Sequence, residues 1–204
     1  MKVGIVALNS SNFRSIGRAL SWIDIESVFI HNCKELNNVS HVILPGVSSF
    51  GSVMNELISR DLIEDIEKFR NKGLPILGLC AGMQIMGKSS EESPGVAGLR
   101  WFDYKSEAIK PNFDVGIRSF HTGWNDVHAH GKNSITSLPG VFYFNHSFCV
   151  QKLPENEISG KTEHGQMFAS VVRKDNIIGA QFHPEKSQSK GLDFLRDFIN
   201  LAYD

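Results

Sequence analysis

The sequence predicts an α/β fold in which a mostly parallel central sheet is flanked by helices and continues into an antiparallel extension. In the first half, short runs rich in Val, Ile and Leu alternate with helix-period segments, which is typical of strand–helix–strand crossovers. After about Gly95, shorter strand candidates are punctuated by Gly, Asn and His, which indicates strands that meander or extend the sheet. Because no repeat, low-complexity tract or linker interrupts the 204 residues, we expect one domain over 1–204.

Apolar spacing places the elements of the first half. Short, continuously apolar runs predict buried strands at Lys2–Leu8, Ser27–Ile30, His41–Leu44 and Leu74–Leu79. Apolar side chains recurring every three or four residues predict helices at Phe13–Ile23 and Leu57–Arg70.

The second half follows the same reasoning with shorter elements. Strands are expected at Gly98–Tyr104, Val141–Val150, Met167–Arg173 and Ile177–Phe182. A final helix is expected at Leu192–Leu201, where five apolar side chains share one face.

Composition excludes several classes of protein. A formal net charge of -1 gives no reason to expect a nucleic acid or a membrane as partner. No apolar run approaches the roughly 20 residues of a membrane span. The three cysteines, Cys33, Cys80 and Cys149, form no CxxC pair, so neither a disulfide framework nor a zinc site is expected, and a cytoplasmic location fits. A metal site built from His121, His128 and His130 is disfavoured because no carboxylate completes it.

One cysteine stands in a setting that favours reactivity. The strand Leu74–Leu79 runs into Gly78-Leu-Cys80-Ala-Gly82, and a helix-compatible segment follows. This is the layout of a nucleophile elbow, in which small residues let the chain turn sharply beneath the reactive side chain. The Ala81 N–H at such a turn is a candidate donor to an oxyanion. The other reading of Cys80 is a buried, inert thiol, which is how we interpret Cys33 and Cys149.

A candidate base follows the last predicted strand. His183 comes directly after it, at the sheet edge where ligands bind in open α/β folds. Glu185, two residues later, falls on the same side of an extended chain and could orient the imidazole. His-Pro-Glu is weak evidence by itself, because the chain has eight histidines.

Two motifs together carry a resemblance. Gly-Leu-Cys-Ala-Gly-Met-Gln at 78–84 and Gln-Phe-His-Pro-Glu-Lys-Ser at 181–187 resemble the class I, triad-type glutamine amidotransferases. Ser-Glu-Glu-Ser at 90–93 and His-x-Gly-Trp-Asn at 121–125 narrow the resemblance to the glutaminase subunits of imidazole glycerol phosphate synthases. The family implies a three-layer, flavodoxin-like sheet, no cofactor, and hydrolysis of L-glutamine to glutamate and ammonia by a Cys-His-Glu triad.

Roles carried over from the family are assigned residue by residue. The triad would be Cys80, His183 and Glu185, and the oxyanion hole would use Gly46, Val47 and Ala81, with a peptide that flips. Glutamine would be held by Ser48, Gln84, Glu92, His146 and Ser147. The family's partner is a (β/α)₈-barrel cyclase in a heterodimer that receives ammonia through a channel, and Asn12, Tyr143 and Lys186 would face it. Ser48 and Phe120 depart from the family's usual Gly and Pro.

Four functions remain open from the sequence. The first is the glutaminase subunit that supplies ammonia for imidazole glycerol phosphate and aminoimidazole carboxamide ribonucleotide in histidine biosynthesis. The second is a paralogous subunit that serves a cyclase-like partner in amidating a surface-polysaccharide sugar, which the departures would suit. A non-catalytic α/β module and a cysteine peptidase on a related fold are the others. The intact triad candidates argue against the module, and Gln84 and Glu92 argue against the peptidase.

Overall fold

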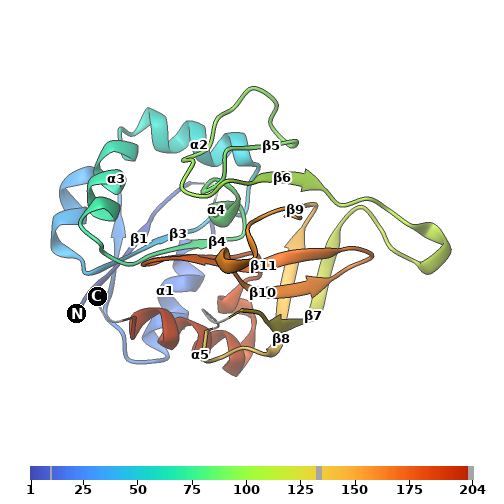
Figure 1. Cartoon of the computed structure of the whole chain (residues 1–204). Coiled ribbons are helices and arrows are strands. Elements are labelled where there is room, and N and C mark those ends of the chain that lie inside the picture. Colours follow the sequence, from blue (N-terminus) through green and yellow to red (C-terminus); the bar gives the residue numbers. More distant parts are fainter. Residues whose placement is uncertain (10, 132–134, 202–204) are drawn as a thin grey trace.

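The predicted α/β fold is confirmed by the computed structural model, which describes residues 1–9, 11–131 and 135–201. Helices cover both faces of a large mixed sheet, and an extension of antiparallel strands projects from one side (Figure 1). The main path of the sheet runs in the order β2-β1-β3-β4-β12-β11-β10-β7-β8.

The first five strands of this path are parallel. They are β2 (Ser27–Ile30), β1 (Val3–Val6), β3 (His41–Leu44), β4 (Ile76–Leu79) and β12 (Ile177–Ala180). All residues of β1, β3, β4 and β12 are buried, as expected of strands covered on both faces. The predicted strands at 2–8, 27–30, 41–44, 74–79 and 177–182 are therefore confirmed.

The extension is antiparallel and larger than the sequence predicted. It contains β11 (Met167–Lys174), β10 (Ile158–Glu163), β7 (His121–Ala129) and β8 (Gly140–His146). A branch leaves β11 through β9 (Phe148–Val150), β6 (Lys105–Ala108) and β5 (Ser89–Ser90). The predicted strand at 167–173 is confirmed, whereas β7 and β10 were missed because neither segment is continuously apolar.

Two helices cover each face of the parallel strands (Figure 1). On one face, α1 (Phe13–Ser21) and α5 (Gln188–Ile199) share a core with β1. On the other, α2 (Phe50–Ser59) and α3 (Ile63–Asn71) pack with a second core. A one-turn helix, α4 (Ala81–Gln84), follows β4 directly. Short 3₁₀ helices lie at Cys33–Asn38, Phe113–Val115, Glu155–Glu157 and Pro184–Lys186.

Three predicted boundaries are wrong for identifiable reasons. The single helix expected at Leu57–Arg70 is two helices, because the chain turns at Asp61, whose φ is 53°. The strand expected at Gly98–Tyr104 does not form, and its aromatic side chains are instead buried from an irregular segment. The strand expected at Val141–Val150 is divided at Ser147 into β8 and β9.

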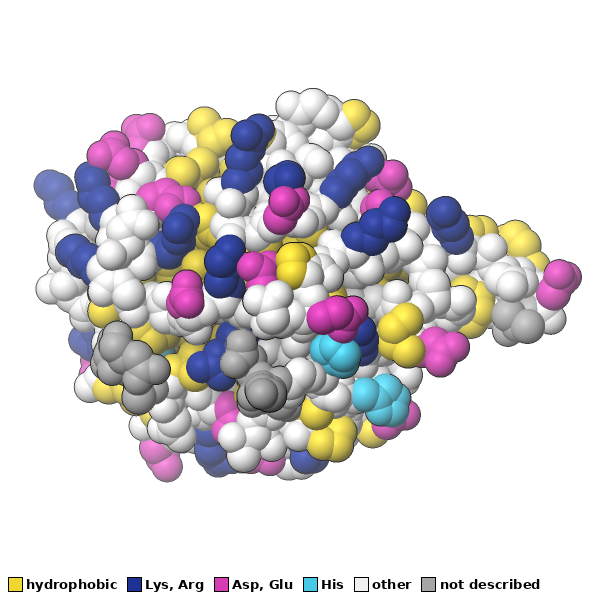
Figure 2. All heavy atoms as spheres, in the orientation of Figure 1, with side chains coloured by type: hydrophobic (Ala, Val, Ile, Leu, Met, Phe, Trp, Pro, Cys, Tyr) yellow, Lys and Arg dark blue, Asp and Glu magenta, His cyan; other side chains and the backbone are white. Residues whose placement is uncertain are grey.

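The distribution of charged side chains on the surface agrees with the near-zero net charge of the sequence. Basic and acidic side chains are interspersed over the face seen in Figure 2. Of the helices that the structure describes, none has the length and apolar character needed to cross a membrane.

Candidate active site

Cys80 lies on a strained turn between β4 and α4. Its backbone has φ 54° and ψ -112°, a conformation that L-residues rarely adopt. Glycines make this turn possible: a Cβ at Gly82 would lie 1.8 Å from the Leu44 carbonyl oxygen, and one at Gly78 would lie 2.6 Å from the Gly82 oxygen. The elbow predicted from Gly-x-Cys-x-Gly is therefore present, with Cys80 6% exposed.

The structure brings His183 and Glu185 to the cysteine. The His183 side chain lies beside Cys80, and its Nδ1 lies 2.9 Å from Glu185 Oε1. The side chains of His183 and Glu185 are 3% and 0% exposed. Backbone contacts hold the ring in place, since the His183 N–H donates to the Tyr143 carbonyl at 2.8 Å. The three side chains are thus arranged in the order sulfur, imidazole, carboxylate, as in a catalytic triad.

The environment of His183 favours its charged form. Burial alone lowers the pKa of the imidazole, but the hydrogen bonds and charges of Cys80 and Glu185 outweigh burial and raise this pKa to about 10. An imidazolium is therefore held beside the sulfur at neutral pH.

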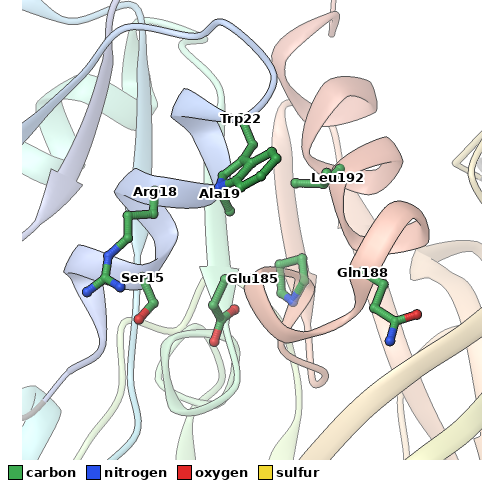
Figure 3. Close-up of a pocket in the computed structure, with 8 residues that line it drawn as sticks. Ser15, Arg18, Ala19, Trp22, Glu185, Gln188 and Leu192 are labelled. Atoms are coloured by element: carbon green, nitrogen blue, oxygen red, sulfur yellow. The ribbon is translucent and has the colours of Figure 1, made fainter.

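Glu185 is also held from α1. The side-chain amide of Asn12 donates to Glu185 Oε1, although Asn12 occupies the N-cap of α1 and makes no capping bond there. Behind the carboxylate, a hollow of about 310 Å³ separates α1 from α5. Figure 3 shows Glu185 between Ser15 of α1 and the start of α5, with the Arg18 side chain pointing away from it. Asn12, predicted to face a partner, thus contacts the triad candidate directly.

A cavity of about 240 Å³ opens beside the sulfur. Its wall combines the nucleophile turn, the segment after β3 and the turn between β8 and β9. Polar residues predicted to bind glutamine line it, namely Ser48, Gln84, Glu92, His146 and Ser147. The cavity is of a size that suits a small amino acid.

In two of these residues, Gln84 and Glu92, one side-chain atom is hydrogen-bonded within the protein and the other oxygen is not. Gln84 Nε2 donates to the Phe148 carbonyl at 2.9 Å and to Gln181 Oε1 at 3.2 Å, which leaves Gln84 Oε1 as an acceptor. Glu92 Oε2 accepts from the Phe50 N–H at 2.7 Å, at the N-terminus of α2. Both residues therefore present a fixed oxygen rather than a mobile side chain.

His146 lines the cavity but does not act as a base. Its ring is buried, Nδ1 lies 2.9 Å from the Phe148 carbonyl, and Nε2 lies 3.1 Å from His121 Nδ1. Burial lowers the pKa of His146 to about 3 and that of His121 to about 4. Both rings are therefore neutral at neutral pH and serve as fixed hydrogen-bonding groups.

The candidate oxyanion hole is incomplete in this conformation. The Ala81 N–H donates to the Gly46 carbonyl at 3.3 Å, so a carbonyl oxygen occupies the position an oxyanion would need. Because C=O and N–H point in opposite directions across a trans peptide, turning the Gly46–Val47 peptide over would bring the Val47 N–H there. A Cβ at Gly46 would lie 2.7 Å from the Ala81 Cβ, which explains the glycine. Ser48 does not adopt a positive φ, so a serine in place of the family's usual glycine causes no backbone strain of that kind.

Two predicted partner-facing residues lie together on β8 and after β12. The Lys186 Nζ lies 5.5 Å from the Tyr143 ring centroid, and Trp124 on β7 packs edge-on against Tyr143 at 6.0 Å. Trp124 is 49% exposed. We call Trp124, Tyr143 and Lys186 the aromatic face.

Three neighbours of the site were not predicted. Gln181 Nε2 lies 3.6 Å from the Cys80 sulfur, the Asn145 carbonyl lies 3.8 Å from it, and Phe120 lines the cavity. Gln181 belongs to the motif that locates His183, but only the pairing of β4 with β12 places it on the sulfur. In the part of the chain that the structure describes, no group of three or more His, Cys, Asp or Glu residues is arranged to hold a metal ion.

Comparison with known proteins gives consistent matches over the whole chain. A family model described as "Glutamine amidotransferase class-I" matches residues 5–201. The chain is 39% identical to "Imidazole glycerol phosphate synthase subunit HisH" of Methanocaldococcus jannaschii, over 98% of this chain and 99% of that one. It is 31% identical to the protein of the same name from Bacillus subtilis, over 98% and 96%.

Solved structures match at the level of the fold. A structure titled "Crystal structure of glutamine amidotransferase" has a TM-score of 0.78 at 20% identity, covering 98% of this chain and 97% of that one. "Structure of PurLQS from Thermotoga maritima" has a TM-score of 0.76 at 18% identity, with the same coverage. At these identities the likeness supports the fold alone.

Proposed function

Because the chain belongs to the class I glutamine amidotransferase family, we propose that it is the glutaminase subunit of an imidazole glycerol phosphate synthase. It hydrolyses L-glutamine to glutamate and ammonia for a partner subunit, as a step of histidine biosynthesis. We assign this activity to one domain spanning 1–204, working in the cytoplasm, where the three free cysteines would stay reduced.

The first half of the reaction forms a thioester. The Cys80 thiolate attacks the side-chain carbonyl carbon of glutamine, and the carbonyl oxygen becomes an oxyanion. The His183 imidazolium gives its proton to the departing nitrogen, so the carbon–nitrogen bond breaks and ammonia leaves. Glu185 holds the ring and balances its charge. No cofactor is needed, because nucleophile, acid and orienting carboxylate all come from this chain.

The second half consumes water. Neutral His183 takes a proton from a water molecule, whose oxygen attacks the thioester carbon. The tetrahedral intermediate then expels the Cys80 thiolate, which restores the ion pair and releases glutamate. Across both halves, glutamine and water give glutamate and ammonia.

The oxyanion requires a change of backbone conformation. The Ala81 N–H supplies one donor and Val47 the second, once the Gly46–Val47 peptide has turned over. Two donors fixed in a site with little water stabilise the oxyanion far more than the same donors would in solution. A peptide with two orientations is also a bistable element through which a partner can regulate hydrolysis.

The cavity recognises the amino-acid end of glutamine. Gln84 Oε1 and the carboxylate of Glu92 are placed to attract the α-ammonium group. The backbone near Ser48, His146 and Ser147 would hold the α-carboxylate. This arrangement favours a free amino acid over a peptide, whose α-amino group carries no charge.

The partner is a cyclase subunit, which we expect to be a (β/α)₈ barrel docked as a heterodimer against Asn12 and the aromatic face. Ammonia is mostly protonated in water at neutral pH and is then not nucleophilic, so a channel between the subunits preserves its reactivity. The contact also reaches the chemistry: Asn12 donates to Glu185, and the Tyr143 carbonyl accepts from the His183 N–H.

The observation that carries the proposal is the position of His183 between Cys80 and Glu185 beside a polar cavity. Cys80→Ala tests it in the complex with the cyclase. We expect the variant to release no glutamate, while partner binding and cyclase turnover with external ammonium stay intact. Near wild-type glutamate release by Cys80→Ala would show that the nucleophile lies elsewhere.

A second assay tests the acceptor. The wild-type complex is given glutamine and the phosphoribulosyl-formimino-carboxamide ribonucleotide, and imidazole glycerol phosphate is measured. The relatives at 31–39% identity carry the name of the synthase subunit, so we favour this acceptor over a polysaccharide sugar. Glutamine hydrolysis with no imidazole product would overturn the acceptor and leave the glutaminase assignment standing.

A further inference from the structure

We infer that Gln181 is a further catalytic residue, whose side-chain amide donates a hydrogen bond to the Cys80 sulfur and stabilises the thiolate. The inference rests on the proposed function and adds to it a group that touches the reacting atom. A thiolate occurs twice in the reaction, first as the nucleophile and again as the leaving group when the thioester is hydrolysed. A donor fixed at the sulfur therefore assists both steps.

Strand register places this donor. In the parallel pair β4–β12, Leu79 lies opposite Ala180, so Cys80 and Gln181 follow as neighbours at the carboxyl edge of the sheet. The Cys80 N–H donates to the Ala180 carbonyl at 2.8 Å, which fixes the approach of the two backbones. Gln181 is 0% exposed, and its Nε2 lies 3.6 Å from Cys80 Sγ. The contact is thus built by the sheet and excludes water.

The orientation of the Gln181 amide follows from its neighbours. The Phe148 carbonyl can only accept, so Gln84 must present Nε2 to it, at 2.9 Å. The same Nε2 donates at 3.2 Å to Gln181 Oε1, which turns Gln181 Nε2 toward the sulfur. Flipping the Gln181 amide alone would place its NH₂ group against the NH₂ group of Gln84. Flipping the Gln84 amide as well would place Gln84 Oε1 against the Phe148 carbonyl oxygen. A backbone carbonyl thereby determines that the sulfur faces a donor.

The other contacts of the sulfur make this donor matter. The Asn145 carbonyl, 3.8 Å away, accepts from the thiol and has nothing to accept once the proton is lost. His183, which faces the sulfur from beyond β12, gives its proton away to the leaving ammonia. The Gln181 amide keeps its hydrogens throughout, so it is the side-chain donor that stays beside the sulfur at every stage.

A second cysteine in the chain provides a built-in control. Gln166 Nε2 lies 3.6 Å from the sulfur of Cys149, the same separation as at Cys80. Burial raises the pKa of the Cys149 thiol to about 11, although the Gln166 hydrogen bond opposes that shift. One glutamine donor therefore does not create a thiolate without an imidazolium. We expect Gln181 to adjust the reactivity of Cys80, not to switch it on.

The test uses two substitutions with different consequences. Gln181→Met keeps the size of the side chain and removes the donor together with the acceptor for Gln84. Gln181→Glu keeps that acceptor and replaces only the group facing the sulfur. Gln181→Glu keeps the bridge between Gln84 and β12, so loss of that bridge cannot explain a shift of the Cys80 profile in this variant. Gln181→Met adds no charge beside the sulfur, so repulsion cannot explain a shift there. A shift in both variants therefore reports the loss of the donor.

The decisive readout is the rate at which iodoacetamide alkylates Cys80, followed by peptide mass spectrometry across pH on the full chain. The titratable groups around the sulfur are His183 with Glu185, and Glu92 and His146 in the cavity wall, and all four are unchanged in both variants. We expect the profile to move to higher pH and the rate at pH 7 to fall about tenfold or more, since hydrogen bonds to charged groups are the stronger ones. In the complex, kcat for glutamine should fall more than KM rises. Gln166→Met should leave the Cys80 profile unchanged.

An alkylation profile for folded Gln181→Met that coincides with wild type would overturn the inference. If neither variant folds, the wild-type protein provides the test. In ¹⁵N-labelled protein, the NMR signals of the Gln181 side-chain amide protons should shift with pH at the same midpoint as the alkylation rate of Cys80. Signals that do not respond to pH would overturn the inference. Failure of the proposed function looks different, because wild-type protein would then release no glutamate whatever the Gln181 variants do.

Discussion

At the scale of single residues, Glu185 depends on its neighbours to carry a buried charge. Its Oε1 accepts from Asn12 and from His183, whereas Oε2 is buried without a hydrogen-bond partner among the described groups. A buried carboxylate that lacks a donor on one oxygen is costly unless a cation lies beside it. The charge of His183 therefore stabilises Glu185 as much as Glu185 stabilises the imidazolium.

Glu185→Gln tests this mutual dependence. Removing the charge should lower the pKa of His183 toward its ordinary value and leave the ring poorly oriented. We expect kcat for glutamine, measured by steady-state kinetics in the complex, to fall about 10³-fold to 10⁴-fold, as for other triads that lose their carboxylate. Glu64→Gln, an exposed site on α3, is the control and should behave as wild type. A loss below tenfold would contradict the role given to Glu185.

Buried His146 in the cavity wall and its neighbour His121 lead to a prediction about acid stability. The pKa values of His146 and His121 are about 3 and 4 in the folded chain, below the ordinary 6.5 of an exposed histidine. Between pH 6.5 and about 4 the unfolded chain binds more protons, so stability is present above 6.5 and falls as the pH drops. The free energy of unfolding, measured with urea at several pH values, should therefore rise with pH over this range. His121→Gln should remove about half of the part of this slope that the two histidines cause. His128→Gln, exposed on the same strand, should leave the slope unchanged.

Sequence located some site residues and not others for a physical reason. The candidates Cys80, His183 and Glu185 each sit in a contiguous motif, and local turn and strand-end chemistry points to them without coordinates. The contact of Gln181 with sulfur depends on how β4 pairs with β12, a register between segments about a hundred residues apart. The contact of Asn12 with Glu185 was not predicted either, because an N-cap residue is expected to bond its own helix.

At the scale of elements, prediction succeeded where strands are buried on both faces. Three of the parallel strands, β1, β4 and β12, consist of four aliphatic or glycine residues, a pattern that can be recognised without knowing the strand's partners. The burial of β7 alternates, but the residue types do not follow it. Trp124 lies on the exposed side and Asn125, hydrogen-bonded to His121, on the less exposed side, so neither apolar alternation nor an apolar run marks the strand in the sequence. Aromatic residues at 101, 102 and 104 show the opposite error, because burial from an irregular segment looks like a strand in sequence.

In the proposed mechanism, turnover depends on the segment after β3. The Gly46 carbonyl accepts from the Ala81 N–H, so the second oxyanion donor is absent until the peptide turns over. Val47→Pro removes the N–H that would become that donor. We expect kcat to fall about 10²-fold to 10³-fold, while iodoacetamide still alkylates Cys80 at the wild-type rate. Val47→Ala keeps the N–H and serves as the matched control. Full activity in the proline variant would mean that Val47 supplies no donor.

At the scale of the whole molecule, the aromatic face and the active site are connected through Tyr143 on β8. Tyr143 directs its ring toward Lys186 and Trp124, while its carbonyl accepts from the His183 N–H and its N–H donates to Ser187 at 3.0 Å. A partner that contacts the ring also contacts the strand that holds the base. Docking of the proposed partner on this face would therefore be connected to catalysis through β8.

This connection, with the incomplete oxyanion hole, predicts a subunit that is nearly idle alone. Glutaminase activity of the isolated chain should rise strongly, by about two orders of magnitude or more, when the cyclase carrying its nucleotide substrate is added, because the second oxyanion donor is worth that much. Full activity of the isolated chain would contradict the coupling.

Tyr143→Ala separates docking from chemistry. Removing the ring takes away packing with Trp124 and Lys186 but leaves the backbone hydrogen bond to His183 available. We expect Kd for the cyclase, measured by calorimetry, to rise about tenfold or more, since a truncated aromatic at an interface centre costs over 1 kcal/mol. Saturating cyclase should restore most of the activity. Val141→Ala, also exposed on β8, controls for a general loss of the strand. Unchanged affinity in Tyr143→Ala would place the partner on a different face of the molecule.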